Sequence, residues 1–331
     1  MKNFWLALER PFFALAPMED VTDAAFRPLI ALRAAPRIPR VFYTEFTSAD
    51  GLVLAPEEGK RKLMKKLEST QDEKPIVAQL FSSVPEHIER ASHLCADLGF
   101  DGVDINMGCP DRAIERQGCG AALIRTPERA QELIRAARRG ARGLPISVKT
   151  RIGYATDELE TWLPALLAES PACIVLHART RDEMSDVPAR WDRIRRAVEI
   201  RDALGSETLI GGNGDVRDLT EAREKVRETR CDGVMLGRAV FGNPWLFASE
   251  SRYEARPEER IAALIEHIDS FKARLSGFVS DAVMKRHFKA YIGGWEGAAE
   301  LRGRLMETAT LSDAATILRD VTLCRETADL K

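Results

Sequence analysis

Short apolar runs alternate with longer amphipathic stretches along the first 240 residues of the chain. The apolar runs are nearly free of polar residues, which is typical of parallel strands that are buried on both faces. They predict strands at Phe12–Pro17, Val41–Phe46, Pro75–Phe81, Gly102–Asn106, Pro145–Thr150, Cys173–Ala178, Thr208–Asn213 and Gly233–Arg238.

The stretches between these runs carry the start and stop signals of helices. Thr126 is a typical N-cap, Pro127 suits the first helical position, and Gly140 is expected just past the end of that helix. A second helix is expected to begin at Pro85 and to stop at Gly99. Strands that alternate with helices in this way predict an α/β fold, a (βα)8 TIM barrel of about 250 residues.

A doubly wound parallel sheet is the competing α/β fold. Its dinucleotide-binding glycines usually follow the first strand, whereas the cluster GGNGD follows the seventh predicted strand here. The barrel is therefore the favoured fold.

The pattern changes after Phe247, where amphipathic helical stretches continue without any strand signal. We therefore expect a barrel domain over residues 1–250 and a small C-terminal all-α helical domain over residues 256–331.

Composition excludes several classes of protein. No apolar run approaches the ~20 residues that span a bilayer, and Glu9 and Arg10 interrupt the apolar N-terminal patch, which argues against a signal peptide. The 6 cysteines lack CxxC spacing. Free thiols in a reducing, cytoplasmic setting are therefore expected, without a disulfide framework, a metal site or a membrane anchor.

The formal net charge of −2 gives the chain no global attraction to nucleic acid. Local basic patches lie at residues 60–66, 135–142 and 284–291. Taken alone, each is typical of a solvated helix face, so composition does not decide the partner.

Polar residues gather at the ends of the predicted strands, where a barrel of this kind places its active site. The seventh and eighth strands end in glycine-rich loops that let the backbone approach an anion, and Arg238 adds a guanidinium group for a phosphate. The alternative is that these glycines only make tight turns. A phosphorylated ligand is the favoured interpretation.

Lys149 and His177 each follow a mostly apolar strand, and the two strands are neighbours. A lone histidine is often a core residue, and a lysine at a strand end is often solvated. Together they would stabilise negative charge on a reduced planar ring, as a flavin requires.

Cys109 lies in a Gly-Cys-Pro loop at the end of the fourth strand, a poor place for a buried hydrophobic residue. A free thiol with a pKa near ~8.5 is mostly protonated at neutral pH, so it suits proton donation at least as well as nucleophilic attack. Gly118 and Gly120 close the same loop, which suggests that the segment folds over a substrate.

Several motifs resemble one known family, the bacterial-type tRNA-dihydrouridine synthases, and the resemblance covers nearly the whole chain. They are APMEDVTD, DINMGCP followed by GCGAALI, SVKTRIG, LHARTR, NGD, LGRA and the C-terminal MKRHFKAYIGGWEGAAELRGRL. The resemblance implies an FMN-holding barrel, a tRNA-gripping helical domain and NADPH or NADH as the reductant. It implies that the residues that bind the cofactor are Pro17, Met18, Glu19, Gln79, Lys149, His177, Asn213, Gly214, Asp215, Gly237 and Arg238.

The family's reaction adds two hydrogens to the C5=C6 bond of a uridine in tRNA. The resemblance implies hydride transfer from the flavin to C6 and proton transfer from Cys109 to C5, with Asn106 orienting the base. The uracil must be flipped out of its stack, because neither group reaches a stacked base.

The chain departs from the family pattern in two places. The loop after Cys109 lacks the usual lysine and has Arg112 and Arg116 as its nearest cations, and Ala178 replaces a glycine. These changes leave the modified uridine position open.

The expected substrate contacts are Arg179, Arg181, Lys285 and Arg286, which would form a track for the tRNA backbone with the basic patches. A monomer is expected. The alternatives are a dihydroorotate dehydrogenase-like enzyme on a free pyrimidine, a non-catalytic RNA-binding barrel, and a flavin-free barrel that binds a sugar phosphate.

Overall fold

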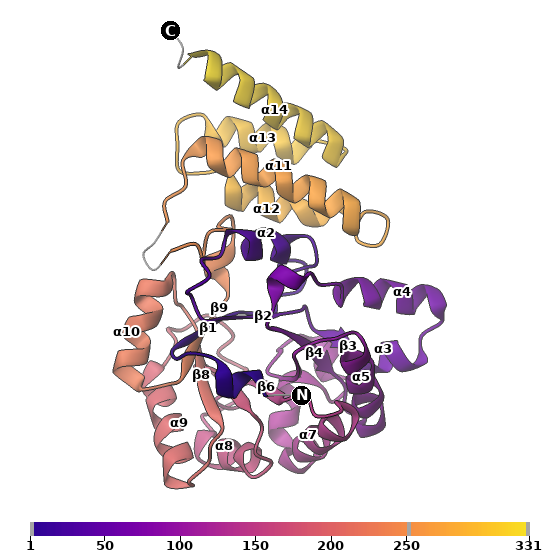
Figure 1. The fold of residues 1–331 in the computed structure, drawn as a ribbon, viewed down its shortest axis with the longest axis vertical. Helices are drawn as coiled ribbons and strands as arrows, with labels where there is room; N and C mark the ends of the chain where they lie inside the picture. The colour runs from indigo at the N-terminus through magenta and orange to yellow at the C-terminus, as the bar shows by residue number, and fades with distance from the viewer. Residues whose placement is uncertain (1–2, 250–252, 329–331) are drawn as a thin grey trace.

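The structure is a computed structural model that describes residues 3–249 and 253–328. Its parallel strands form one sheet that closes on itself, since β1 pairs with both β2 and β9 and β2 pairs with β4 (Figure 1). The barrel strands are β1 (Phe12–Leu15), β2 (Arg40–Tyr43), β4 (Ile76–Phe81), β5 (Gly102–Met107), β6 (Ile146–Arg151), β7 (Cys173–His177), β8 (Leu209–Asn213) and β9 (Gly233–Leu236). The two-residue β3 (Thr47–Ser48) extends the sheet beside β4. The predicted TIM barrel is confirmed.

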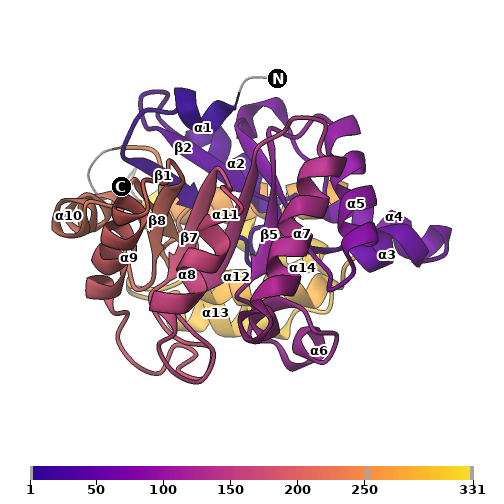
Figure 2. The same ribbon diagram turned by 90° about the horizontal axis from the view of Figure 1, so that it is seen from below.

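The barrel interior is filled by side chains rather than hollow. Phe12, Val41, Val77 and Val175 belong to one buried cluster that is contributed by separate strands. The short helix α1 (Phe4–Ala7) closes the N-terminal end, where Trp5 meets Phe12 edge to face at 5.1 Å between ring centroids. Figure 2 shows α1 and α6 (Arg112–Glu115) at opposite ends of the barrel, so the C-terminal ends of the strands open on the α6 side.

Helices follow the strands as predicted and cover the outside of the barrel. They are α2 (Phe26–Arg33), α3 (Ala49–Leu54), α4 (Glu57–Lys66), α5 (Pro85–Asp97), α7 (Pro127–Gly140), α8 (Leu159–Leu167), α9 (Trp191–Ala203) and α10 (Leu219–Thr229).

Gly140 corrects one detail of the prediction, because it is the last residue of α7 and not the residue after it. A Cβ at Gly140 would lie 1.9 Å from the backbone oxygen of Glu89, so this glycine lets α7 pack directly on α5. The chain reverses two residues later, at Arg142 and Gly143, where φ is 50° and 88°.

The C-terminal part is all-helical, as predicted, with α11 (Pro257–Arg274), α12 (Met284–Tyr291), α13 (Ala298–Glu307) and α14 (Leu311–Ala328). These helices stack against the barrel beside α2 (Figure 1). Phe26 of α2 stacks on His267 at 4.6 Å, and Ser270 donates a hydrogen bond to the backbone oxygen of Ala25 at 2.9 Å. The predicted domain end at residue 250 and the last residues, 329–331, lie outside the described residues.

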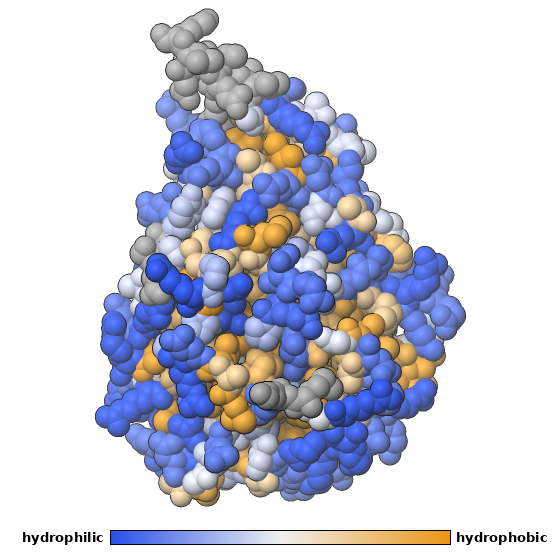
Figure 3. All heavy atoms as spheres, viewed as in Figure 1, coloured by the Kyte–Doolittle hydropathy of each residue, from blue (hydrophilic) through white to orange (hydrophobic). Residues whose placement is uncertain are grey.

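Hydrophilic residues cover most of the molecular face shown in Figure 3, with scattered apolar positions among them. Among the residues that the structure describes, no helix has the length and apolar character needed to cross a membrane.

Candidate active site

A cleft of about 620 Å³ opens at the C-terminal ends of the strands. Its volume lies within the range of roughly 300–1,000 Å³ that is typical of small-molecule sites. The predicted cofactor residues that line it come from five strands and their loops: Pro17, Met18, Lys149, His177, Asn213, Gly214, Asp215, Gly237 and Arg238. The structure therefore brings most of the predicted site into one cleft.

One end of the cleft carries the guanidinium group of Arg238, whose side chain is 66% exposed. Arg238 donates to Asp215 Oδ1 at 2.6 Å, and Asp215 has the left-handed φ of 57° that the turn after β8 requires. The hydrogen bond from Arg179 and the charges of Arg179 and Arg238 hold the pKa of Asp215 below its usual range despite partial burial. Two guanidinium groups thus share one carboxylate, and the net positive charge that remains suits this part of the cleft to a phosphate group.

Arg179 was expected to contact tRNA, and in the structure it already has partners within the protein. It is only 2% exposed, and its guanidinium group binds Asp215, the Val187 backbone oxygen at 2.6 Å and His177 Nε2 at 3.1 Å. Arg179 is the second residue beyond β7, and its side chain forms part of the cleft wall. Its guanidinium group is therefore already paired within the wall of the cleft, and the tRNA contact at Arg179 stays a prediction.

Lys149 and His177, from the neighbouring strands β6 and β7, also line the cleft. Lys149 Nζ donates to Asn213 Oδ1 at 3.3 Å, and Asn213 Nδ2 donates to the Met235 backbone oxygen at 2.8 Å. Burial, helped by the charge of Arg151, lowers the pKa of Lys149 to about 8, so the amine is still mostly charged at neutral pH.

His177 is neutral, because burial and the surrounding cations lower its pKa well below the usual value. Arg179 can only donate, so His177 Nε2 accepts and the ring proton resides on Nδ1. His177 therefore carries a hydrogen-bond donor at Nδ1 and no charge.

A buried chain of side chains runs beneath the cleft from β6 to β4. Ser147 donates to Asp104 at 2.6 Å, and Gln79 Nε2 donates to the same carboxylate at 2.7 Å. Asn106 Nδ2 in turn donates to Gln79 Oε1 at 3.2 Å. Burial raises the pKa of Asp104 to about 6. Gln79 and Asn106 are thus fixed in orientation rather than free to rotate.

Asn106 also fixes the backbone at Cys109. Its Oδ1 accepts hydrogen bonds from Gly108 N at 3.1 Å and Cys109 N at 2.9 Å. The Cys109 oxygen accepts from Ala121 N at 2.9 Å, and a Cβ at Gly120 would lie 2.6 Å from that oxygen. Gly120 is therefore needed for close packing, with φ of 62°, and not only for flexibility.

The side chain of Cys109 is partly exposed, and it packs against the small cluster of Phe81, Ile114 and Cys119. Burial raises the pKa of Cys109, and the charges of Lys149 and Arg151 offset only part of that rise. The thiol is therefore protonated at neutral pH, as proton donation requires.

This raised pKa predicts slow reaction of Cys109 with iodoacetamide at neutral pH. We expect the alkylation rate, followed by mass spectrometry of the Cys109 peptide, to rise with pH around a midpoint above the ~8.5 of a free cysteine. N-acetylcysteine in the same buffers is the control. A midpoint at or below that of the control would contradict a buried, protonated thiol.

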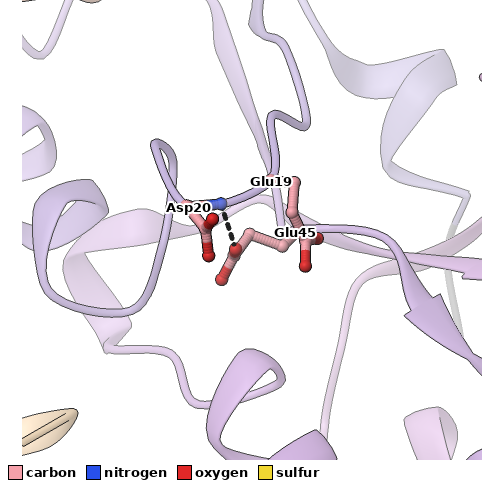
Figure 4. Close-up of side chains that lie close together, drawn as sticks. All are labelled: Glu19, Asp20 and Glu45. Atoms are coloured by element: carbon pink, nitrogen blue, oxygen red, sulfur yellow. Dashed lines mark hydrogen bonds between the residues drawn. The ribbon is translucent and has the colours of Figure 1, made fainter. Parts of the chain in front are cut away.

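Glu19 was expected along the flavin, but it is not among the residues that line the cleft. It pairs with Lys66 of α4 and lies close to Asp20 and Glu45 (Figure 4). Glu45 accepts a hydrogen bond from Asp20 N at 2.8 Å, and burial raises its pKa to about 7. These carboxylates brace the β1–α2 loop that carries Met18.

The other residues that were expected to contact tRNA already have partners within the protein. Arg181 pairs with Glu115, and Lys285 Nζ donates to the Met306 backbone oxygen at the end of α13 at 2.9 Å. Arg286 remains 45% exposed while it contacts the β1–α2 loop at Glu19 O and Asp20, at 3.3 and 3.5 Å.

The predicted basic patches also have acidic partners. In residues 135–142, Arg135, Arg139 and Arg142 pair with Glu169, Glu89 and Asp97 on neighbouring helices. In residues 60–66, the lysines pair with Glu57, Glu58, Glu68 and Glu19. The patch on α7 therefore offers little net positive charge to a tRNA.

The sequence placed Arg151 at a strand end beside Lys149 but gave it no role, and it did not identify Asp104 as part of the site. Arg151 Nε donates to the Gly108 oxygen at 2.9 Å, and Nη1 donates to the Thr180 oxygen at 2.9 Å. Side chains two residues apart on a strand point to the same face of the sheet. Asp104 lies two residues before Asn106, and Arg151 lies two residues after Lys149, so this spacing could have indicated both residues.

Comparisons with known proteins agree with the motifs. The family described as "Dihydrouridine synthase (Dus)" matches residues 14–327. The chain is 40% identical to a "Probable tRNA-dihydrouridine synthase" of Staphylococcus epidermidis over 322 residues, which cover 96% of this chain and 95% of that protein. It is also 40% identical to the "Probable tRNA-dihydrouridine synthase 2" of Bacillus subtilis over 321 residues, which cover 96% of both chains.

Proposed function

Because this chain belongs to the dihydrouridine synthase family, we propose that it is a tRNA-dihydrouridine synthase, a flavin-dependent oxidoreductase that reduces uridine in tRNA to 5,6-dihydrouridine. The observation that carries the proposal is a cleft lined by Lys149, His177 and Arg238, whose lining also includes Pro110, the residue directly after the protonated Cys109. Such a cleft suits a planar, phosphorylated redox cofactor better than a sugar phosphate alone.

FMN fits the donor set of the cleft. Arg238 and the turn at Gly214 and Asp215 would bind its phosphate region, while Lys149 and His177 would face its ring system. Bound FMN would supply a hydride to C6 of the uracil after reduction by NADPH or NADH. Lys149 would favour negative charge on the ring at neutral pH, and His177 would donate a hydrogen bond from Nδ1.

Cys109 would give the proton that C5 of the uracil needs. Its backbone is held by Asn106, whose amide is itself oriented by Gln79. This arrangement keeps the thiol in one place, so that proton transfer requires no rearrangement of the loop. A uracil must leave its stack to enter the cleft, which makes tRNA binding and base flipping part of the same step.

The test is the dihydrouridine content of unmodified tRNA after incubation with the purified protein, FMN and NADPH. A mass gain of two hydrogens at a uridine is expected, and its position in the tRNA identifies the modified site. No gain on several tRNAs from a flavin-loaded protein would overturn the proposal in favour of a free pyrimidine or another small acceptor. A cytoplasmic location and a monomeric state remain parts of this proposal.

Binding of tRNA is expected to weaken steeply with salt, because bound cations displace counterions from the phosphate backbone. Arg286 is the exposed candidate closest to the cleft, since it contacts the β1–α2 loop. We expect Arg286→Ala to reduce the slope of log affinity against log salt concentration by about 1.

The matched control is Arg135→Ala on α7, where the arginine already pairs with Glu169. Fluorescence anisotropy of labelled tRNA across salt concentrations measures both slopes. A flat salt response of the wild-type protein, or an equal change in both variants, would contradict a tRNA contact at Arg286.

A further inference from the structure

The short helix α6 belongs to the loop that carries Cys109, and its Glu115 meets Arg181 of the β7–α9 loop. Arg181 Nε lies 2.9 Å from both carboxylate oxygens of Glu115, and Nη2 contacts Oε2 as well. The Glu115 side chain is 9% exposed and that of Arg181 is 20% exposed. A charge-assisted pair with several contacts and little exposure is well ordered and poorly screened by salt.

Contacts with the segment after β6 also hold Arg181 in place. Its backbone N donates to the Gly153 oxygen at 2.9 Å, and its guanidinium group lies 5.5 Å from the ring centre of Tyr154. Arg125 lies 4.4 Å from the centre of the same ring. The guanidinium group therefore has few conformations to lose when it binds Glu115.

The Glu115–Arg181 pair contacts the Cys109 segment after the cysteine, whereas the other hydrogen bonds hold Gly108 and Cys109 themselves. Arg151 holds the Gly108 oxygen before the cysteine, and Ala121 N holds the Cys109 oxygen. Arg181 Nη2 lies 3.5 Å from the Pro110 oxygen directly after the cysteine, and Glu115 ties the following helix to the neighbouring loop. The segment is pinned on both sides of the thiol.

We propose that Glu115 and Arg181 are positioning residues that hold the Cys109 loop in its proton-delivering position. The inference rests on the proposed function and deepens it. It reassigns Arg181 from a tRNA contact to an internal clamp, and it replaces a loop that closes over the substrate with a loop that is assembled before the substrate arrives. A preassembled thiol avoids the cost of ordering the loop in each turnover.

The experiment measures two quantities on flavin-loaded protein: the rate of Cys109 alkylation by iodoacetamide without tRNA, and kcat and KM for tRNA. The variants are Glu115→Ala, Arg181→Ala and the charge exchange Glu115→Arg with Arg181→Glu. Glu160→Ala, which breaks an exposed ion pair with Arg196, is the matched control.

We expect both single variants to raise the alkylation rate severalfold and to lower kcat about tenfold with KM nearly unchanged, because a misplaced donor loses rate rather than affinity. The charge exchange should recover part of both losses, and Glu160→Ala should change neither quantity. Thermal melting verifies folding, and Glu115→Gln serves where an alanine variant does not fold.

Unchanged alkylation in both single variants would overturn the clamp. A higher KM with unchanged kcat in Arg181→Ala would also overturn it, because that result assigns Arg181 to tRNA binding. If the wild-type protein does not reduce tRNA at all, the proposed function fails, while the alkylation rates still decide whether the pair holds the loop.

Discussion

Cys109→Ala is expected to lower the rate of uridine reduction in tRNA by about 10²–10⁴-fold, the usual contribution of a general acid. Burial keeps the Cys109 thiol protonated, and Asn106 holds the Cys109 backbone directly before Pro110, which lines the cleft. Loss of Sγ removes the proposed proton donor, whereas the cofactor residues Lys149 and His177 are untouched.

Single-turnover measurements separate the steps in this variant. Flavin content, reduction of the flavin by NADPH and tRNA affinity should match the wild-type protein, while dihydrouridine formation should fall. Cys119→Ala is the matched control, because Cys119 is buried in the same small cluster, whereas Cys109 is partly exposed and directly precedes Pro110 of the cleft lining. An unimpaired Cys109→Ala variant, or an equal loss in Cys119→Ala, would remove Cys109 from the mechanism.

The apolar runs predicted a parallel α/β fold, because each strand is buried on both faces, and the position of the glycine cluster after the seventh predicted strand favoured the barrel over a doubly wound sheet. The phosphate end was predictable for a related reason. Parallel strands bring their C-terminal ends to one edge, so Asn213 and Arg238 had to lie near each other.

The sequence did not show which cations of the expected tRNA track are already paired, because their acidic partners are distant in the sequence. Arg135 looks like part of a free basic patch until Glu169 is placed beside it, and Arg139 pairs with Glu89 from another helix. Arg179 is likewise paired, with Asp215 in the turn that follows the next strand, β8. A charge pattern shows which cations exist, but only the fold shows which of them are already neutralised.

The glycines in the loop after Cys109 have a different role from the one that the sequence suggested. Its glycines suggested a mobile segment, yet Gly120 is required by the close approach of the Cys109 oxygen. Sequence alone does not distinguish a glycine that permits motion from one that permits packing. In this loop, the hydrogen bonds that Asn106 and Arg151 make to the backbone around Cys109 favour the packing role.

The buried ion pair between α2 and the segment before β4 is expected to have a large effect on stability. Arg27 and Glu73 are both fully buried, with Arg27 Nε donating to Glu73 Oε2 at 2.7 Å. The remaining donors of Arg27 bind the backbone oxygens of Thr22 at 2.7 Å and Glu68 at 2.6 Å. This pair ties α2, on which the helical part rests, to the barrel.

Arg27→Met should lower the free energy of unfolding by about 3–5 kcal/mol, because it leaves the Glu73 carboxylate buried without its cation. The double variant Arg27→Met with Glu73→Gln should lose less, since an uncharged amide replaces the isolated charge. Urea denaturation followed by circular dichroism measures both. Arg319→Met, at a half-exposed pair with Asp269, is the control and should hardly move the midpoint. A loss for Arg27→Met no larger than that of the control would show that the buried pair does not hold α2 in place.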